Sequence, residues 1–185
     1  MVWANPLTLR RAGILGMNRR NARYIGEFNP RERFPLVDDK LKTKLIAERA
    51  GISVPGLLHV IRAQHEIERV AETLRHERDF VVKPAHGSGG KGILVVTGRN
   101  EDRFVKSSGA EISLLDLHRH LSNILAGLYS LGGRTDVAIV EQLIRVTPTF
   151  EHLSFEGVPD VRLIVFRGYP VMSMLRLATK ASDGK

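Results

Sequence analysis

The chain contains no cysteine among its 185 residues, which excludes disulfide bonds, thiolate catalysis and cysteine-based zinc sites. It also lacks any apolar run near the roughly 18 residues that a membrane-spanning helix needs, so we expect no membrane partner. Aromatic residues are scarce at 6% of the chain, and this disfavours the base-stacking surfaces of nucleic-acid-binding modules. A cysteine-free chain is compatible with a reducing compartment, and we expect a cytoplasmic location.

Positive charge is in excess but unevenly distributed. The chain carries 28 Lys and Arg against 20 Asp and Glu, a net charge of +8. Residues 1–35 hold seven Arg and two Glu, a net of +5, while the other 150 residues hold 21 basic and 18 acidic residues, a net of +3. Because the first 35 residues show little apolar periodicity, they predict a basic extended arm. Such an arm is either simply solvated or a site for an anionic partner.

Capping residues and apolar spacing predict three helices. Asp39 is a suitable N-cap for the first helix, which ends at Gly51. Its apolar stripe consists of Leu41, Leu45 and Ile46. The second helix follows from four apolar residues at helical spacing, namely Ile67, Val70, Ala71 and Leu74. The third helix begins at a capping box of Ser113 and Asp116 and ends at Gly132.

Short β-branched and apolar runs predict the strands. Residues 80–83 and 93–96 form a strand–loop–strand unit, and residues 137–143 are apolar around Glu141 and indicate a buried strand. Residues 161–166 and 171–175 flank a turn at Arg167-Gly168 and predict a β-hairpin. Helices come first, then mixed elements, then strands. We therefore predict an α+β (mixed α/β) fold.

The most informative stretch is the glycine-rich loop of residues 85–92. It has four glycines in six positions, and their backbone N–H groups can closely approach a polyphosphate. Lys83 and Lys91 add positive charge for phosphate oxygens. The loop is not a Walker P-loop, because Lys91 is followed by Gly92 rather than Ser or Thr and a strand follows. A flexible surface hairpin remains the alternative interpretation.

Two further groups of residues could carry chemistry. Glu141 places a carboxylate inside an apolar strand, where it either has buried partners or faces water from an edge strand. Asp160 and Arg162 share one face of a hairpin strand, and Arg176 lies on the other strand. These three residues form either a surface ion pair or, beside a phosphate loop, an anion clamp.

In their order along the chain, these motifs resemble the ATP-grasp superfamily. The matching segments are Asp39-Lys40 with Thr43-Lys44, Gly51-Ile52-Ser53-Val54-Pro55, Val82-Lys83-Pro84, the loop of residues 86–92, residues 141–144 and Asp160-Val161-Arg162. Within the superfamily, the chain is similar to the ribosomal-protein-S6-modification type, in particular to alpha-L-glutamate ligase-like proteins. The run Gly16-Met17-Asn18-Arg19-Arg20-Asn21 resembles that group specifically.

This resemblance implies ATP-dependent joining of a carboxylate to an amine through an acyl phosphate. The carboxylate and amine substrates would be amino acids or peptides. Arg162 and Arg176 would be catalytic and would stabilise the transferred phosphoryl charge. Asp160 would approach the ribose, and Glu141 would lie near the adenine amino group in a hinge. The nucleotide-binding residues that the resemblance implies are Lys40, Lys83, His86, Gly87, Ser88, Gly89, Gly90, Lys91, Gly92, Glu141, Gln142, Leu143, Ile144, Asp160 and Lys185.

We expect residues 36–185 to form the front part of an ATP-grasp domain that is incomplete at its C-terminus. Residues 36–135 would hold helices and the phosphate-lid subdomain, and residues 136–185 the start of the C-terminal subdomain. The family binds Mg²⁺ through carboxylates that we expect beyond Lys185, so this part alone should show no ligase turnover and should self-associate. Alternatives are a kinase-like ATP-grasp enzyme, a basic nucleic-acid-binding module or a degenerate, non-catalytic ATP-grasp domain.

Overall fold

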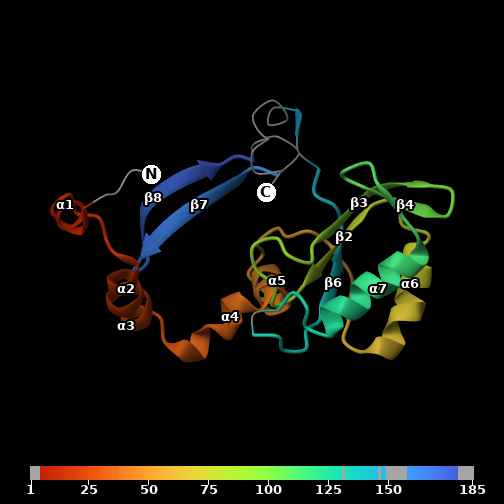
Figure 1. The fold of residues 1–185 in the computed structure, drawn as a ribbon, viewed down its shortest axis with the longest axis horizontal. Helices are drawn as coiled ribbons and strands as arrows, with labels where there is room; N and C mark the ends of the chain where they lie inside the picture. Colours follow the sequence, from red (N-terminus) through yellow and green to blue (C-terminus); the bar gives the residue numbers. More distant parts are fainter. Residues whose placement is uncertain (1–4, 131, 146, 149–157, 179–185) are drawn as a thin grey trace. The chain divides into compact units, whose positions relative to one another are not determined.

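Six antiparallel strands form the main sheet, in the order β1-β6-β2-β3-β4-β5 (Figure 1). The computed structural model describes residues 5–130, 132–145, 147–148 and 158–178. It divides into two units, Met1–Val37 and Asp38–Lys185. The strands of the main sheet are β1 (Leu57–Ile61), β2 (Phe80–Pro84), β3 (Leu94–Asn100), β4 (Arg103–Lys106), β5 (Glu111–Ile112) and β6 (Ala138–Glu141). Mixed helices and antiparallel sheets confirm the predicted fold class.

The first unit is built from short helices. They are α1 (Pro6–Arg11), α2 (Met17–Arg20), the π-helix η1 (Asn21–Ile25), α3 (Gly26–Phe28), the 3-10 helix η2 (Arg31–Arg33) and α4 (Pro35–Asp38), which runs to the unit boundary. The prediction of an extended conformation for this arm is therefore wrong. The Asn5 side chain caps α1 by accepting a hydrogen bond from the Leu7 N–H (2.9 Å), and Pro6 occupies the first helical position, where its missing N–H costs nothing.

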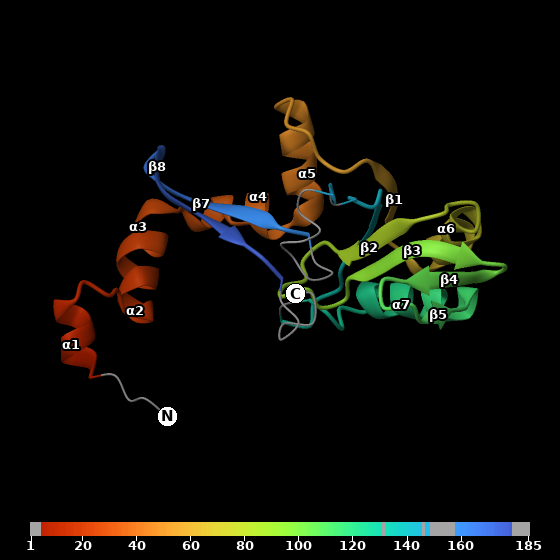
Figure 2. The ribbon, with the colours of Figure 1, turned by 90° about the horizontal axis from the view of Figure 1, so that it is seen from above.

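The two faces of the main sheet carry different helices (Figure 2). Helices α6 (Ile67–Leu74) and α7 (Leu114–Leu125) pack on one face, and their buried residues join Val82 and Val140 in the larger core cluster. Helix α5 (Lys40–Arg49) contributes Leu41 to a smaller cluster with Ile139. Since successive strand residues point to opposite faces, Ile139 and Glu141 lie on the α5 face. A short 3-10 helix, η3 (Gln64–Glu66), precedes α6.

The helix predictions are confirmed in part. Asp39 caps α5, and the Ser113–Asp116 capping box opens α7. All four predicted core residues of α6 are buried. On α5, however, Leu45 and Ile46 are exposed, and Lys44 is buried in their place. Helix α7 ends near Gly127 instead of Gly132, because Gly127 adopts φ +80°. There the Gly127 and Leu128 N–H groups close a Schellman motif on the Ile124 and Asn123 carbonyls.

Strands β7 (Asp160–Phe166) and β8 (Tyr169–Arg176) form a separate antiparallel hairpin, as predicted. Arg167 and Gly168 make its turn with φ +50° and +88°, the left-handed conformations that a tight hairpin turn needs. All residues of both strands are exposed. None of the described helices has the length and apolar character needed to cross a membrane.

We predict that Leu121→Ala lowers the free energy of unfolding by about 2–5 kcal/mol, because Leu121 is fully buried between α7 and the sheet. Urea denaturation followed by circular dichroism measures this change. Leu115→Ala, on the same helix at 64% exposure, is the matched control and should change the unfolding free energy by less than about 0.5 kcal/mol. Equal losses in both variants would contradict the described packing of α7.

Candidate functional site

Glu141, the last residue of β6, lies at the centre of a buried ionic cluster on the α5 face of the sheet. Its side chain is only 6% exposed. Its Oε1 lies 3.1 Å from the Lys44 Nζ, and its Oε2 makes an ion pair with the Lys83 Nζ. Strand β6 lies between β1 and β2, so the alternative of an edge-strand Glu facing water is wrong. The carboxylate has the cationic partners that a buried charge requires.

The two lysines that hold Glu141 differ in their access to solvent. Lys44 is 5% exposed and also donates a hydrogen bond to the Pro55 carbonyl, so its ammonium group has two partners inside the protein. Lys83, on β2, remains 26% exposed. Two cations share one carboxylate, which leaves positive charge in excess. Lys83 is the member of the cluster that can present this charge to an anion arriving from solvent.

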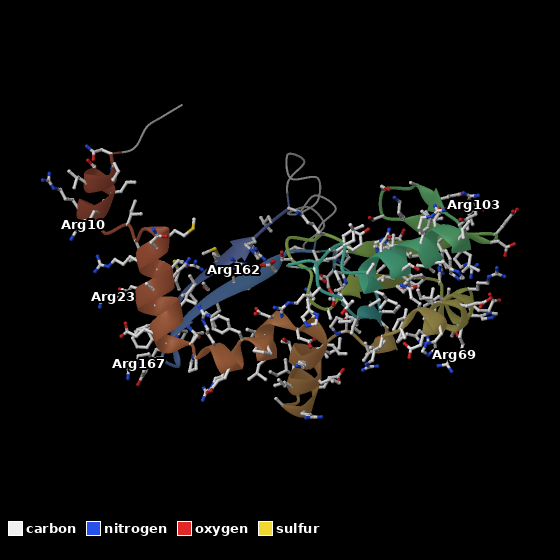
Figure 3. All side chains as sticks on the ribbon, turned by 60° about the horizontal axis from the view of Figure 1, so that its bottom comes forward. Arg10, Arg23, Arg69, Arg103, Arg162 and Arg167 are labelled. Atoms are coloured by element: carbon white, nitrogen blue, oxygen red, sulfur yellow. The ribbon has the colours of Figure 1, made fainter. Side chains whose placement is uncertain are left out.

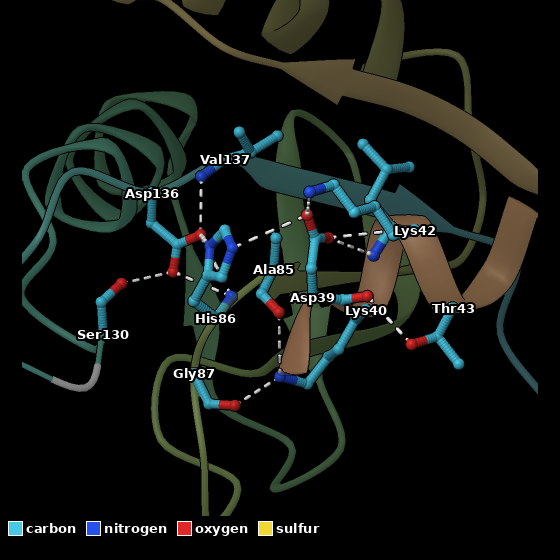
Figure 4. A network of polar contacts seen from close by, with 11 residues as sticks. Asp39, Lys40, Lys42, Thr43, Ala85, His86, Gly87, Ser130, Asp136 and Val137 are labelled. Carbon is cyan, nitrogen blue, oxygen red and sulfur yellow. Dashed lines mark hydrogen bonds and ion pairs between the residues drawn. The ribbon is translucent and has the colours of Figure 1, made fainter. Parts of the chain in front are cut away.

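Lys40 joins the first turn of α5 to the base of the glycine-rich loop (Figure 4). Its Nζ donates to the Ala85 carbonyl (3.3 Å) and to the Gly87 carbonyl, and its backbone N–H donates to the Ala85 carbonyl (3.0 Å). Burial lowers the pKa of Lys40, and the positive charge of Lys83 lowers it further, while Asp136 and Asp39 act in the opposite direction. The proximity of Lys83 shows that two predicted phosphate-binding lysines share one environment.

Asp136 anchors the start of the loop. Its side chain is fully buried and accepts hydrogen bonds from the His86 N–H (3.1 Å), the His86 Nδ1 (2.7 Å), the Val137 N–H (2.7 Å) and the Ser130 hydroxyl. Burial acts to raise the pKa of Asp136, but the hydrogen bonds outweigh it and hold the pKa below its usual value. The other ring nitrogen of His86, Nε2, lies 3.6 Å from Asp39 Oδ2.

The far end of the loop is fixed against α7. The His120 Nε2 donates to the Gly92 carbonyl (3.0 Å), and burial lowers the pKa of His120. Gly92 has φ +75°, and an added Cβ would lie 2.5 Å from the Tyr129 ring, so only glycine fits there. Between these ends, four loop residues are exposed, namely Ser88, Gly89, Gly90 and Lys91. The loop therefore has an anchored base and a solvent-exposed tip.

The structure brings only some of the predicted site residues together. Lys40, Lys83 and Glu141 lie with the loop of residues 86–92, and the Gln142 N–H bonds the Gly56 carbonyl (2.9 Å) directly after Glu141. In the hairpin, Arg176 holds Asp160 in a two-pronged ion pair (Nε–Oδ1 2.7 Å), which lowers the pKa of Asp160 and raises that of Arg176. Of the remaining predicted residues, the structure describes Leu143, Ile144 and Arg162. Lys185 lies outside the described residues.

Sequence reasoning missed three residues of the network as participants: Ser130, Asp136 and His120. Ser130 and Asp136 lie in loop sequence without any periodic pattern, so the sequence alone carries no signal for them. From the sequence, Lys44 is included only as part of the Thr43-Lys44 motif. A signal for its burial did exist, because a carboxylate inside an apolar strand requires cations and Lys44 follows the buried Leu41 by three residues.

We predict that Asp136→Asn weakens the acid sensitivity of the fold. The folded-state pKa of Asp136 lies below its unfolded value of about 4, so its contribution is present above that pH and is lost as the pH falls through the folded-state pKa. Asp136→Asn should cost about 1–3 kcal/mol at pH 7 and lose less stability on acidification. Urea titrations between pH 7 and 3 measure both effects. Asp102→Asn, at an exposed position, serves as control, and unchanged acid sensitivity in Asp136→Asn would refute the anchoring role.

Comparison with known proteins supplies the family. No curated protein and no solved structure matches the chain significantly. Among protein families, the chain matches the one described as sugar-transfer associated ATP-grasp, over residues 19–185. This match covers the lysines, the glycine-rich loop, Glu141 and the hairpin. It supports the ATP-grasp resemblance and an ATP-dependent, ligase-type domain in general. The chain belongs to the sugar-transfer associated ATP-grasp family.

Proposed function

We propose that this chain carries the nucleotide-binding part of an ATP-dependent ligase that joins a carboxylate to an amine through an acyl phosphate, as glutamate ligase-like proteins do. The observation that carries the proposal is the convergence of Lys40 and Lys83 at the base of a glycine-rich loop, beside a buried Lys44–Glu141 pair. The candidate substrates are amino acids and peptides. The family's description associates it with sugar transfer and names no amine or carboxylate substrate.

The cationic cluster suits a polyphosphate. Lys83 is accessible and, among the described residues, its counter-ion is the carboxylate that it shares with Lys44, so an incoming phosphate would gain a charge-assisted hydrogen bond without displacing Lys44. Lys40 has a pKa lowered by burial, and a bound anion would favour its charged form. Together they would orient the phosphates of ATP and offset negative charge that grows during phosphoryl transfer.

The exposed tip of the loop is proposed to close over these phosphates. Gly89 and Gly90 adopt φ +61° and +74°, conformations open to glycine that allow successive N–H groups to turn toward an anion. The tip is short, and both of its ends are held, by the His86–Asp136 and His120–Gly92 bonds. Closure would therefore move the tip alone and would leave Lys40 and Lys83 in place.

Adenine is proposed to bind the backbone of residues 142–144. Both carboxylate oxygens of Glu141 are held by lysines, so the backbone, rather than this carboxylate, would bind the adenine amino group. The Gln142 N–H already donates a hydrogen bond to the Gly56 carbonyl. The backbone N–H and carbonyl groups of Leu143 and Ile144 are therefore the ones proposed to bind the base. Roles for Asp160, Arg162 and Arg176 at the ribose and the transferred phosphoryl group remain part of the proposal.

Magnesium, which the family generally uses, does not fit the described residues. In that part of the chain no group of three or more His, Asp or Glu side chains could hold a metal ion. The carboxylates near the loop are committed elsewhere: Glu141 to lysines, Asp136 to four hydrogen-bond donors and Asp39 to the N-terminus of α5. No step of the proposed reaction is therefore assigned to a metal bound by these side chains.

We predict that Lys83→Ala weakens ATP binding about 10–100-fold, because it removes one charge-assisted phosphate contact. Isothermal titration calorimetry measures the affinity for ATP. Thermal melts show whether the variant, which keeps the Lys44–Glu141 pair, is still folded. Lys42→Ala is the matched control: it also removes one lysine, but Lys42 lies on α5 with its side chain 57% exposed, so this variant is expected to leave ATP affinity unchanged. Unaltered affinity in a folded Lys83→Ala would refute the phosphate site.

The acyl phosphate is tested on the full natural protein. With ATP, magnesium and a candidate carboxylate, hydroxylamine should intercept the acyl phosphate and yield a hydroxamate together with ADP and phosphate, with one ATP consumed per hydroxamate. Lys83→Ala should lower the hydroxamate yield at fixed ATP. Phosphorylation of a substrate without hydroxamate would support the kinase-like alternative and overturn the ligase proposal, even if ATP binding is confirmed.

A further inference from the structure

The unit Met1–Val37 has no interior of its own. None of its described residues, 5–37, is buried, although short helices organise most of them. A segment of this size that folds around no core leaves some of its apolar side chains exposed to water. Its net charge is +5, so a surface that covers this unit has to accept both apolar side chains and a strong positive charge.

Exposed aliphatic side chains lie on α1, in the turn that follows it and at the start of α2. Leu7, Ile14 and Met17 are 63%, 57% and 73% exposed. Their placement follows from the end of α1, where Gly13 adopts φ +77° and closes a Schellman motif. In this motif the Ile14 N–H bonds the Leu9 carbonyl (2.9 Å) and the Gly13 N–H bonds the Arg10 carbonyl (3.1 Å). The motif ends α1 and turns the chain sharply, so that Ile14 and Leu15 lie outside the helix.

Arginines lie between these aliphatic residues and after them in the sequence. Within residues 1–26 there are five, and there is no Asp, Glu or Lys: Arg10, Arg11, Arg19, Arg20 and Arg23. Figure 3 shows Arg10 projecting from α1 and Arg23 from the helical segment that follows α2. All five are exposed. Guanidinium groups bind phosphate oxygens through two parallel hydrogen bonds, so this row of cations is suited to a surface of phosphate groups.

We propose that this unit docks on an anionic phospholipid surface, with its arginines on the headgroup phosphates and Leu7, Ile14 and Met17 inserted at the boundary of the acyl chains. Short basic segments with exposed apolar residues bind such surfaces without spanning them. Our expectation of no membrane partner was drawn from the lack of a spanning run, which surface binding does not require. Nucleic acid fits less well, because the most exposed apolar residues described in the unit are aliphatic and cannot stack on bases, whereas Tyr24 and Phe28 are only 43% and 41% exposed.

The full chain is tested by co-sedimentation with vesicles of phosphatidylcholine containing 30% phosphatidylglycerol, compared with pure phosphatidylcholine and with a single-stranded RNA 20-mer. We expect binding to the anionic vesicles that weakens with salt. Arg19→Gln with Arg23→Gln should weaken it about 30-fold, roughly fivefold for each charge. The matched control, Arg69→Gln with Arg78→Gln, removes the same charge from exposed positions of the second unit and should change vesicle binding less than twofold.

A second variant separates lipid insertion from simple charge attraction. Ile14→Ser with Met17→Ser keeps all arginines and should reduce vesicle binding several-fold while leaving RNA binding unchanged. Three results would each overturn the proposal. They are equal binding to neutral and anionic vesicles, equal loss of vesicle binding in the two double Arg→Gln variants, and vesicle binding that the Ser variant leaves unchanged. Tighter binding to RNA than to anionic vesicles would also overturn it. ATP affinity is measured alongside, since it is independent of this unit in the proposal.

Discussion

Burying a carboxylate costs several kcal/mol unless cations and hydrogen-bond donors replace the water that it loses. Glu141 has two cations as ion-pair partners, one lysine from helix α5 and one from strand β2. The requirement fixes the rotation of α5, because Lys44 must face the sheet and Leu45 and Ile46 then face solvent. It also brings Lys40 to the glycine-rich loop, since Lys40 lies one helical turn before Lys44. The geometry of the candidate phosphate site thus depends on one buried charge.

The glycine-rich loop combines a fixed base with an open tip for a related reason. Asp136, fully buried, can be satisfied only by donors from the loop and its neighbours, and it recruits two from His86 alone. At the other end, the close approach of Gly92 to Tyr129 leaves no room for a side chain. Between these constraints residues 88–91 are exposed, so a ligand bound there would have to order only a few residues.

Much of the fold could be predicted because its signals are local. Asp39, the Ser113–Asp116 pair and the spacing of the α6 residues act within one or two helical turns, and the structure confirms each. The errors have two sources, an interaction between distant parts of the chain and a local glycine signal earlier than the predicted one. The burial of Lys44 depends on a carboxylate 97 positions later in the chain, and α7 ends at Gly127 rather than Gly132 because the earlier glycine already allows the left-handed turn. The lysines, the loop and Glu141 were predicted from a resemblance, whereas Asp136 and Ser130 lacked any pattern to predict them.

The place of β6 in the sheet has a consequence for biosynthesis. This strand lies between β1 and β2, yet it is the last of the six strands to be made, about 80 residues after β1. During translation, β1 has no partner strand in the main sheet until residues 138–141 leave the ribosome, and at 5–20 residues per second that interval lasts several seconds. Throughout it, Lys44 and Lys83 have no carboxylate between them. Long-range pairing of this kind slows folding, so the nascent chain is most open to chaperones just before its ionic centre forms.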